Sequence, residues 1–376
     1  MNNIEQILSK VVYEGLKLTS KQAEILFGIN SSEEVELIRK YADILRNNIA
    51  GDKVSYIVNL NVNFTNICES VCLFCGFRRN EGDPEAYILD LERFEEQLAH
   101  AAKEGISEIC FQGGLYSRLK IRGLEQNNLL DNYTGLLNFV KSRYPEIHIH
   151  AYSPEEIDFL SILTGRSNRY ILEYFKDSGL DSMPGTAAEI LSDDIRKKIC
   201  PKKLNTNKWV EIIKLAHNLD IPTTATIMYG HVEQNYHRAA HLETLRNIQE
   251  ETGGFTEFIP LPFISSRTLL SGKVAPLISV DRLKMLAISR LFFREMIPNI
   301  QASWVKQGVD ETAESLDWGV NDIGGTLGDE RITFEAGGGF GKNMRKEQLI
   351  EIITSKNRIP VLRDTLYNHC KEFVAV

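Results

Sequence analysis

Long apolar runs are missing from this sequence of 376 residues. No stretch approaches the roughly 18 apolar residues of a transmembrane helix, and residues 1–5 have neither the basic stretch nor the apolar core of a secretion signal. An excess of positive charge is missing too, because 43 Lys and Arg stand against 51 Asp and Glu, for a net charge of −8. This balance argues against a generally basic binder of nucleic acids or anionic membranes. We therefore expect a cytoplasmic protein with no nucleic-acid and no membrane partner.

Cysteine is scarce, and two common catalytic signatures are absent. The glycine-rich residues 337–342 do not form a P-loop, which needs Gly where Ala336 stands and Ser or Thr where Asn343 stands. The sequence has no Gly-x-Ser-x-Gly elbow of a serine hydrolase. The six cysteines are unevenly spread, since three of them lie within eight residues. In a reducing cytoplasm this clustering indicates a metal site rather than a disulfide framework.

Residue periodicity predicts strands that alternate with helices. Residues 1–52 are expected to form a helical extension, with capping boxes from Thr19 to Gln22 and from Ser31 to Glu34. After it, short apolar runs alternate with amphipathic helices, an order that is typical of parallel strand pairing. The eight predicted strands cover residues 56–63, 108–112, 147–151, 182–183, 223–228, 256–260, 299–305 and 317–321.

Eight such units predict an α/β fold, a (β/α)₈ TIM-type barrel over residues 53–330, although fewer closed strands would also fit. Residues 331–376 are predicted to form a C-terminal helical segment, joined through the glycine-rich residues 337–341. The expected architecture is therefore one barrel with helical N-terminal and C-terminal extensions.

The clustered cysteines directly follow the first predicted strand. That loop lies at the carboxyl mouth of the barrel, where barrel enzymes keep their active sites. Cys68, Cys72 and Cys75 are spaced as Cys-x₃-Cys-x₂-Cys, with Phe74 before the third. Structural zinc takes four ligands and ordinary electron-transfer clusters take four cysteines. Three close ligands therefore favour a [4Fe-4S] cluster with one open iron, and a zinc site completed by a distant His or Cys is the alternative.

This spacing resembles the signature of the radical S-adenosylmethionine (SAM) enzymes. The resemblance implies that Cys68, Cys72 and Cys75 hold a [4Fe-4S] cluster whose open iron binds the amino and carboxylate groups of SAM. It also implies a reductant protein as partner, since an electron from the cluster cleaves SAM to a 5′-deoxyadenosyl radical that abstracts hydrogen from the substrate. A barrel suits this chemistry because it keeps water and stray C–H bonds away from the radical.

Residues at the ends of later strands are expected to bind SAM. Gln112-Gly113-Gly114 resembles the glycine motif of the family, which meets the amino group of SAM through backbone carbonyls; a plain βα turn is the alternative. Glu189 is expected to meet the ribose or amino group of SAM, with a surface carboxylate at a helix start as the alternative. The expected SAM-binding residues are Phe74, Phe77, Gln112, Gly113, Gly114, His150, Ser153 and Glu189.

Further segments narrow the resemblance to the tyrosine-using subunits of deazaflavin (FO) synthase. They are residues 182–191, 199–204, 252–261, 299–306 and 319–327, within a likeness that covers roughly residues 50–335. The run Pro184-Gly185-Thr186 and residues 321–326 favour this family over its sisters of menaquinone synthesis, aminofutalosine synthase and dehypoxanthine futalosine cyclase.

The narrower resemblance implies a reaction between two substrates, L-tyrosine and 5-amino-6-(D-ribitylamino)uracil. The adenosyl radical takes hydrogen from the amino group of tyrosine, the Cα–Cβ bond breaks, and the 4-hydroxybenzyl fragment adds to the pyrimidine, leaving 2-iminoacetate. The resemblance also implies functional pairing with a second radical SAM protein that cyclises the product.

Polar residues near the mouth are candidates for the substrate site. The expected catalytic residues are His231, Asn321 and Asp322, although a structural role is equally expected for His231. Arg78 and Arg79 are expected to neutralise a carboxylate, unless they form a solvated basic pair. The expected substrate contacts are Asn63, Thr65, Asn66, Arg78, Tyr229, Glu233, Trp304 and Thr326. Cys200 recurs in a motif of the family, and we interpret it as structural rather than as a fourth ligand.

Two departures from the family pattern leave the substrates open. Family members follow the sixth strand with a His-x-Asn-x-Pro-like segment, whereas residues 263–270 here read Phe-Ile-Ser-Ser-Arg-Thr-Leu-Leu. The loop over residues 115–133 is also longer than usual. A paralogous radical SAM enzyme, aminofutalosine synthase-like or with a changed amino-acid donor or acceptor, is therefore the alternative hypothesis.

Overall fold

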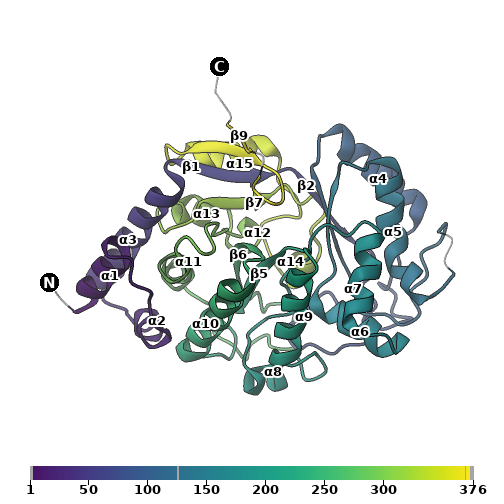
Figure 1. The fold of residues 1–376 in the computed structure, drawn as a ribbon, viewed down its shortest axis with the longest axis horizontal. Helices are drawn as coiled ribbons and strands as arrows, with labels where there is room; N and C mark the ends of the chain where they lie inside the picture. Colours follow the sequence, from purple (N-terminus) through teal and green to yellow (C-terminus); the bar gives the residue numbers. More distant parts are fainter. Residues whose placement is uncertain (1–2, 125–126, 369, 373–376) are drawn as a thin grey trace.

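The computed structural model describes residues 3–124, 127–368 and 370–372. It begins with three helices, α1 (Asn3–Tyr13), α2 (Ser20–Phe27) and α3 (Ser32–Ala50), as expected for the first part of the chain. Thr19 forms the predicted capping box with Gln22, whereas Ser31 makes no side-chain hydrogen bond at the start of α3. The three helices pack on α10 and α11, on the outside of the strands (Figure 1).

Parallel strands build the centre of the fold. β1 and β2 are two halves of one strand, interrupted at Val58. β2 pairs with β3 and β3 with β4, while β5 pairs with β6 and β7 with β1. The bounds are β1 (Lys53–Ile57), β2 (Asn59–Asn63), β3 (Glu108–Gln112), β4 (His148–Ala151), β5 (Thr223–Tyr229), β6 (Phe255–Pro262) and β7 (Asp322–Gly325).

Two short extended segments close these strands into a ring. Parallel bridges join Ser182 to β4 and Met183 to β5. Further parallel bridges join Ile300 to β6 and Gln301 to β7. With β1 and β2 counted as one strand, the two segments complete a ring of eight. The prediction of a (β/α)₈ barrel is confirmed.

Amphipathic helices cover the outside of the ring. In α4 (Leu91–Lys103), for example, the buried side chains are Phe94, Leu98 and Ala101, which lie on one face at helical spacing. Helices α4 to α7 lie on the side opposite α1 to α3 (Figure 1). In the described part of the chain, no helix is both long and apolar enough to cross a membrane. The bounds are α4 (Leu91–Lys103), α5 (Leu129–Arg143), α6 (Pro154–Thr164), α7 (Asn168–Asp177), α8 (Asp193–Ile199), α9 (Thr206–Asn218), α10 (Asn235–Thr252), α11 (Ser279–Phe293), α12 (Trp304–Gln307), α13 (Val309–Ser315), α14 (Ile332–Glu335) and α15 (Lys346–Thr354).

The last two predicted strands are misplaced or too long. A strand is predicted over residues 299–305, but only Ile300 and Gln301 form bridges and α12 follows at once. The strand predicted over residues 317–321 lies instead at β7. The cause is Gly319, whose φ of 93° turns the chain and which lies so close to Arg290 that a Cβ would come within 2.8 Å.

The C-terminal segment is helical only in its first half, so the prediction of a helical segment over residues 331–376 is wrong for the second half. After α15 come β8 (Ile359–Arg363) and β9 (Cys370–Glu372). β8 pairs in parallel with β1, and β9 is antiparallel to β8. β1 offers an edge here because β3 pairs with β2 and not with β1. Apolar, extended residues such as Val361 and Leu362 fill that edge.

Candidate active site

A cavity of about 400 Å³ lies within the barrel, a volume that is typical of small-molecule sites. Opposite strands line it, for example with Thr226 of β5 and Ile323 of β7. The loop that carries Cys68, Cys72 and Cys75, which we call the cysteine loop, borders the cavity at the carboxyl ends of the strands, and we refer to this end as the mouth. At the opposite end lie Glu257, near the amino end of β6, and Arg363, the last residue of β8, and we refer to this end as the floor.

The three clustered cysteines face the cavity from one loop. Cys68, Cys72 and Cys75 all line it. Backbone hydrogen bonds fix the loop, from Cys68 N to Arg79 O (3.1 Å) and from Cys75 N to Cys72 O (3.2 Å). The amide of Leu115 donates to the Cys68 sulfur over 3.4 Å. Burial raises the pKa of Cys72 to about 12, so a metal that binds this thiol must displace its proton.

The arrangement of these thiols fits a cluster. Within the described ranges, no group of three or more His, Cys, Asp and Glu side chains is arranged to hold a metal ion. A [4Fe-4S] cluster binds each thiolate through a different iron, so its ligands lie farther apart than those of one ion. Three thiols that one loop turns toward one cavity therefore suit the predicted cluster by donor type and by placement.

The glycine motif at the end of β3 is packed against the cysteine loop. A Cβ on Gly114 would lie 2.1 Å from Ile67 O, and one on Gly113 would lie 2.5 Å from the Phe64 ring. Gly114 N also donates to Thr65 O over 2.8 Å. Both glycines line the cavity, as does Gln112. They are therefore more than a plain βα turn, because only glycine allows β3 to approach the cysteine loop this closely.

Glu189 lies in the cavity wall, paired with Lys203. The carboxylate accepts a hydrogen bond from Lys203 Nζ at 2.8 Å, and its side chain is only 13% exposed. Burial alone raises the pKa of Glu189, but the nearby Lys203 ammonium outweighs it and the pKa is lowered. Glu189 and Ala187 adopt left-handed φ values of 46° and 62°. Arg196 holds this strained turn by donating to Ala187 O and Ala188 O. The surface alternative for Glu189 is wrong.

Two acidic residues that the sequence analysis missed extend this end of the cavity. Glu155 and Glu156 stand in the first turn of α6 and line the cavity beside Ser153. Ser153 Oγ donates to Glu156 Oε2 over 2.8 Å, while Glu156 Oε1 is buried without a partner in the described part of the chain. Burial raises the pKa of Glu156 to about 7. The spacing of Ser153 and Glu156 is a capping box, a signal that is readable in the sequence.

Lys306 also lines the cavity, although it is not among the predicted site residues. It follows the Gln301 bridge at the mouth and lines the cavity. Burial lowers the pKa of Lys306, although Glu330 opposes the shift. Among the described residues, Lys306 makes no ion pair within 4.0 Å. An ammonium that lines a cavity without a carboxylate partner is a strong site for an anionic group.

Five further predicted contacts do line the cavity. They are Phe74, Phe77, Arg78, His150 and Trp304. Arg78 Nε donates to the carbonyl of the first cluster cysteine over 3.0 Å and makes no ion pair with a described residue. Burial lowers the pKa of His150 to about 4, so this ring is neutral at pH 7. Trp304 donates its indole N–H to Gly325 O at 2.9 Å. Arg79 is not available for a substrate, because it pairs with Glu85 and Glu335 instead.

Three residues at and just after the end of β2 bind neighbouring backbone segments rather than lining the cavity. Thr65 Oγ1 donates to Tyr87 O at 2.6 Å, and Asn66 Nδ2 donates to Glu85 O at 2.8 Å. Asn63 Nδ2 donates to the carbonyl of Gln112 at 3.3 Å. The predicted substrate contacts of these three side chains are therefore not supported, since none of them lines the cavity, although Asn63 Oδ1 is buried without a partner in the described part of the chain.

The predicted residues at and after the end of β5 also lie outside the cavity lining. Glu233 accepts hydrogen bonds from Gly230 N (2.6 Å) and His231 N (2.8 Å) and so holds a tight turn. His231 Nε2 lies 3.1 Å from Met228 O, and burial lowers the pKa of this ring. Tyr229 is fully buried. The geometry favours the structural alternative for His231 and gives Tyr229 and Glu233 no access to the cavity.

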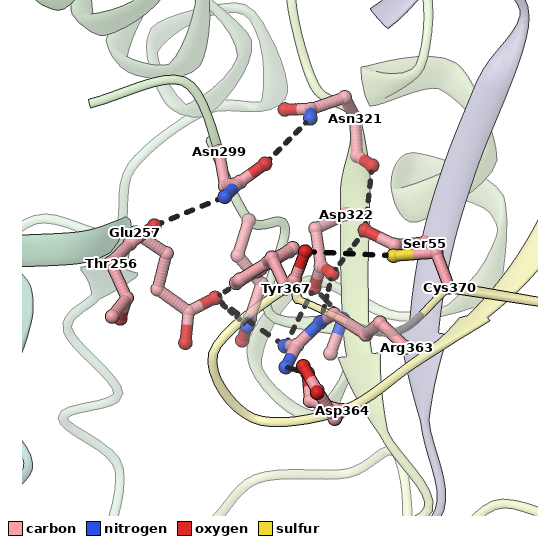
Figure 2. Close-up of polar contacts among 12 residues, drawn as sticks. Ser55, Thr256, Glu257, Asn299, Asn321, Asp322, Arg363, Asp364, Tyr367 and Cys370 are labelled. Carbon is pink, nitrogen blue, oxygen red and sulfur yellow. Dashed lines mark hydrogen bonds and ion pairs between the residues drawn. The ribbon is translucent and has the colours of Figure 1, made fainter. Parts of the chain in front are cut away.

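The predicted residues around β7 belong to the protein framework. Asp322 pairs with Arg363 and accepts from Ser55 Oγ at 2.6 Å (Figure 2). Asn321 Oδ1 accepts from Arg290 Nη2 at 2.5 Å. Thr326 Oγ1 donates to the carbonyl of Asn59 at 2.8 Å. None of the three predicted side chains is in the cavity lining, so their catalytic or substrate roles lack geometric support.

Cys200 lies away from the cavity, in keeping with the structural role that the sequence predicts. Cys200 is buried at the end of α8 and does not line the cavity. Burial raises the pKa of Cys200 to about 11.

The segment over residues 263–270, which differs from the family pattern, reaches the cavity. Phe263 and Ile264 contribute an apolar wall to it, and the Phe263 ring packs edge-on against His231, with 6.2 Å between the ring centres. The segment that differs from the family pattern therefore lies at the cavity, as expected.

Family comparisons cover most of the chain. The model of the radical SAM superfamily matches residues 62–245, and that of the CofH/MqnC C-terminal region matches residues 252–375. A protein of Methanothermobacter thermautotrophicus named 5-amino-6-(D-ribitylamino)uracil–L-tyrosine 4-hydroxyphenyl transferase is 43% identical over 98% of each chain. Proteins of the same name are 44% identical in Methanocaldococcus jannaschii, over 93% of this chain and 96% of the relative, and 41% identical in Gloeobacter violaceus, over 94% and 91%.

Solved structures show the same fold at low sequence identity. Methylornithine synthase superposes with a TM-score of 0.73 and 17% identity, over 94% of this chain and 97% of that chain. The FeFe-hydrogenase maturase HydG from Carboxydothermus hydrogenoformans gives a TM-score of 0.70 and 16% identity, over 97% of this chain and 80% of that chain.

Proposed function

The chain belongs to the radical SAM superfamily, in the family with the CofH/MqnC C-terminal region, and we propose that it transfers the 4-hydroxybenzyl fragment of L-tyrosine to 5-amino-6-(D-ribitylamino)uracil in deazaflavin coenzyme synthesis. One observation carries the proposal. This chain matches a transferase of that name over almost its whole length, and its three clustered cysteines line one cavity within the barrel. Enzymes of this superfamily use a [4Fe-4S] cluster and SAM, which together supply the adenosyl radical when bound.

The mouth of the cavity has the residues to hold both cofactors. Cys68, Cys72 and Cys75 are the proposed cluster ligands. For SAM, the backbone carbonyls at Gly113 and Gly114 accept from the amino group, and the ionised Glu189 accepts from a hydroxyl or the amino group. Support comes from the placement of all six residues in the lining of one cavity. Phe74, Phe77, Gln112, His150 and Ser153 complete the proposed SAM site.

L-Tyrosine is proposed to bind next to SAM with its carboxylate on Lys306. This ammonium lines the cavity and makes no ion pair with a described residue, so an incoming carboxylate stabilises it. Arg78 offers a second cation at the same end. Phe263, Ile264 and Trp304 form apolar parts of the wall, which exclude water from a radical reaction and suit a phenol ring.

Three further aspects are part of the same proposal. A reductant protein supplies the electron, and a second radical SAM protein cyclises the product. The cytoplasm is the proposed compartment, in keeping with six free cysteines. The proposed organisation is a helical extension (residues 1–52), a barrel (residues 53–330) and a C-terminal segment (residues 331–376), the last of which adds β8 and β9 to the helices.

The test is an anaerobic assay of protein reconstituted with iron and sulfide. Reduced protein receives SAM, tyrosine and the ribitylaminouracil, and mass spectrometry follows 5′-deoxyadenosine and the benzylated pyrimidine, with each substrate omitted in turn. Both products are expected only when both substrates are present. Cys75→Ser is expected to abolish both products, whereas Cys370→Ser, an exposed cysteine away from the cavity, should retain them. Deoxyadenosine without the adduct would contradict the proposed substrates.

A further inference from the structure

The C-terminal segment builds part of the cavity floor. Arg363 ends β8 and Thr365 follows it, and both line the cavity. Farther on, Tyr367 donates its hydroxyl to Glu257 Oε2 over 2.6 Å (Figure 2). A segment outside the ring of eight strands thus reaches the space in which the substrates are proposed to bind.

Arg363 is fully engaged by groups of the protein. Its Nε donates to Asp322 Oδ2 at 2.6 Å, and its Nη2 lies 3.4 Å from both Glu257 Oε2 and Asp322 Oδ1 (Figure 2). Its Nη1 donates to Asp364 O at 3.2 Å. One buried guanidinium therefore serves two buried carboxylates, and burial raises the pKa of Glu257. Arg363 has no free charge to offer to a substrate carboxylate.

Other polar groups that line the cavity beside Arg363 are uncommitted. Thr365 Oγ1 is buried and has no hydrogen-bond partner in the described ranges. Glu257 Oε2 accepts three hydrogen bonds, whereas its Oε1 accepts none from the described residues. The side-chain amide of Asn61, in the adjoining wall, likewise makes none with the described part of the chain. A buried hydroxyl such as that of Thr365 loses free energy unless a ligand or water satisfies it.

These groups match a neutral ligand that is rich in hydroxyls. Each hydroxyl both donates and accepts, so a polyol can satisfy a carboxylate oxygen, a threonine hydroxyl and an amide without adding charge. A zwitterion such as tyrosine needs free charge, and the cations without an ion pair, Lys306 and Arg78, border the mouth.

We infer that the floor binds the polyol chain of the acceptor substrate and that Thr365 of the C-terminal segment is a specificity-determining residue for it. The inference rests on the proposed function, in which that polyol is the ribityl chain. It places the pyrimidine between the floor and tyrosine, so that the acceptor ring faces the fragment that it receives. The C-terminal segment then selects the acceptor although it lies outside the barrel.

The test compares two acceptors and three forms of the full-length protein. Calorimetry measures the binding of 5-amino-6-(D-ribitylamino)uracil and of 5,6-diaminouracil, which lacks the polyol, in the absence of SAM and tyrosine. Thr365→Val keeps the shape of the side chain and removes its hydroxyl, and Thr365→Ser restores a hydroxyl. Thr256→Val is the matched control, because Thr256 precedes Glu257 on β6 and is not in the cavity lining. Thr365→Ala replaces Thr365→Val if the latter does not fold.

Thr365→Val is expected to weaken binding of the ribitylated compound about tenfold, the usual effect of one or two lost hydrogen bonds, and to leave that of diaminouracil unchanged. Thr365→Ser and Thr256→Val should bind both compounds as the wild type does. Equal weakening for both compounds, or no weakening, would overturn the inference while adduct formation by the wild type still supported the proposed function. A wild type that forms no adduct would overturn the proposed function and, with it, the assignment of the polyol.

Discussion

Gly114 is the position where one added methyl group should remove the cluster from this protein. In Gly114→Ala the new Cβ would lie 2.1 Å from Ile67 O, 2.7 Å from Ile67 C and 3.0 Å from Cys68 Cβ. Ordinary van der Waals contact begins near 3.4 Å, so the backbone at Ile67 has to retreat by more than 1 Å. The obstacle is backbone rather than a flexible side chain, and the residue that follows it is the first proposed cluster ligand.

The size of this shift decides the expected result. Metal–ligand distances are tolerated within only about 0.2 Å of their usual values, whereas the carbonyl next to Cys68 must move several times farther. The overpacking itself costs about 1–3 kcal/mol, which a fold of this size can absorb. We therefore expect Gly114→Ala to fold and to lose most of its iron, with little 5′-deoxyadenosine formed.

The assay is iron and sulfide content together with visible absorption after anaerobic reconstitution, and circular dichroism verifies the fold. Gly339→Ala is the matched control, since a Cβ on Gly339 meets no heavy atom within 4 Å. It should load iron as the wild type does. Equal iron content in Gly114→Ala, Gly339→Ala and wild type would refute the reasoning, because it would mean that the cysteine loop tolerates the displacement.

Two further predictions concern a charge in the cavity and a histidine outside it. Lys306→Met should raise the KM for tyrosine about 10- to 100-fold, the usual worth of a charged hydrogen bond, and leave the KM for the acceptor unchanged, with partial recovery in Lys306→Arg. An unchanged KM for tyrosine would count against Lys306 as the carboxylate partner. Burial lowers the pKa of His217 to about 4, so the unfolded chain takes up its proton first and the stability that the neutral ring provides is lost as pH falls from about 6.5 towards 4. Urea unfolding should therefore show that the wild type loses about 2 kcal/mol more than His217→Gln between pH 7.5 and pH 5, and parallel losses would contradict this.

The barrel and the cysteine loop could be predicted because their signals are local. The spacing of Cys68, Cys72 and Cys75 and the order of strands and helices are both readable along the chain. The prediction of a strand over residues 317–321 is wrong because the turn at Gly319 depends on packing against Arg290, far away in the sequence. The strand β8 escaped prediction for a similar reason, since it depends on an edge of β1 more than 300 residues earlier.

The candidate site was harder to predict, because a residue at the end of a strand can turn its side chain into the barrel or away from it. His231 and Asp322 follow or begin strands at plausible places, yet both bind neighbouring protein groups. Glu189 and Arg78, equally plausible from their positions, do line the cavity. Lys306 lies within a segment that resembles the family, but its place in the cavity lining and its lack of an ion pair with a described residue are visible only in the folded protein.

The floor explains why the C-terminal segment accompanies this barrel. Asp322 and Glu257 project two carboxylates toward the same guanidinium, and without Arg363 they would face each other in a buried space that opposes ionisation. Arg363, at the end of β8, is that cation. Beyond β8, Tyr367 donates its hydroxyl to Glu257, and the Thr365 hydroxyl, which has no partner among the described residues, lies at the cavity. Because Asp322 and Glu257 already pair with the Arg363 guanidinium, the floor has no free positive charge. Its remaining polar groups therefore suit a neutral ligand. One segment thus stabilises the charges beneath the cavity and sets what the cavity accepts.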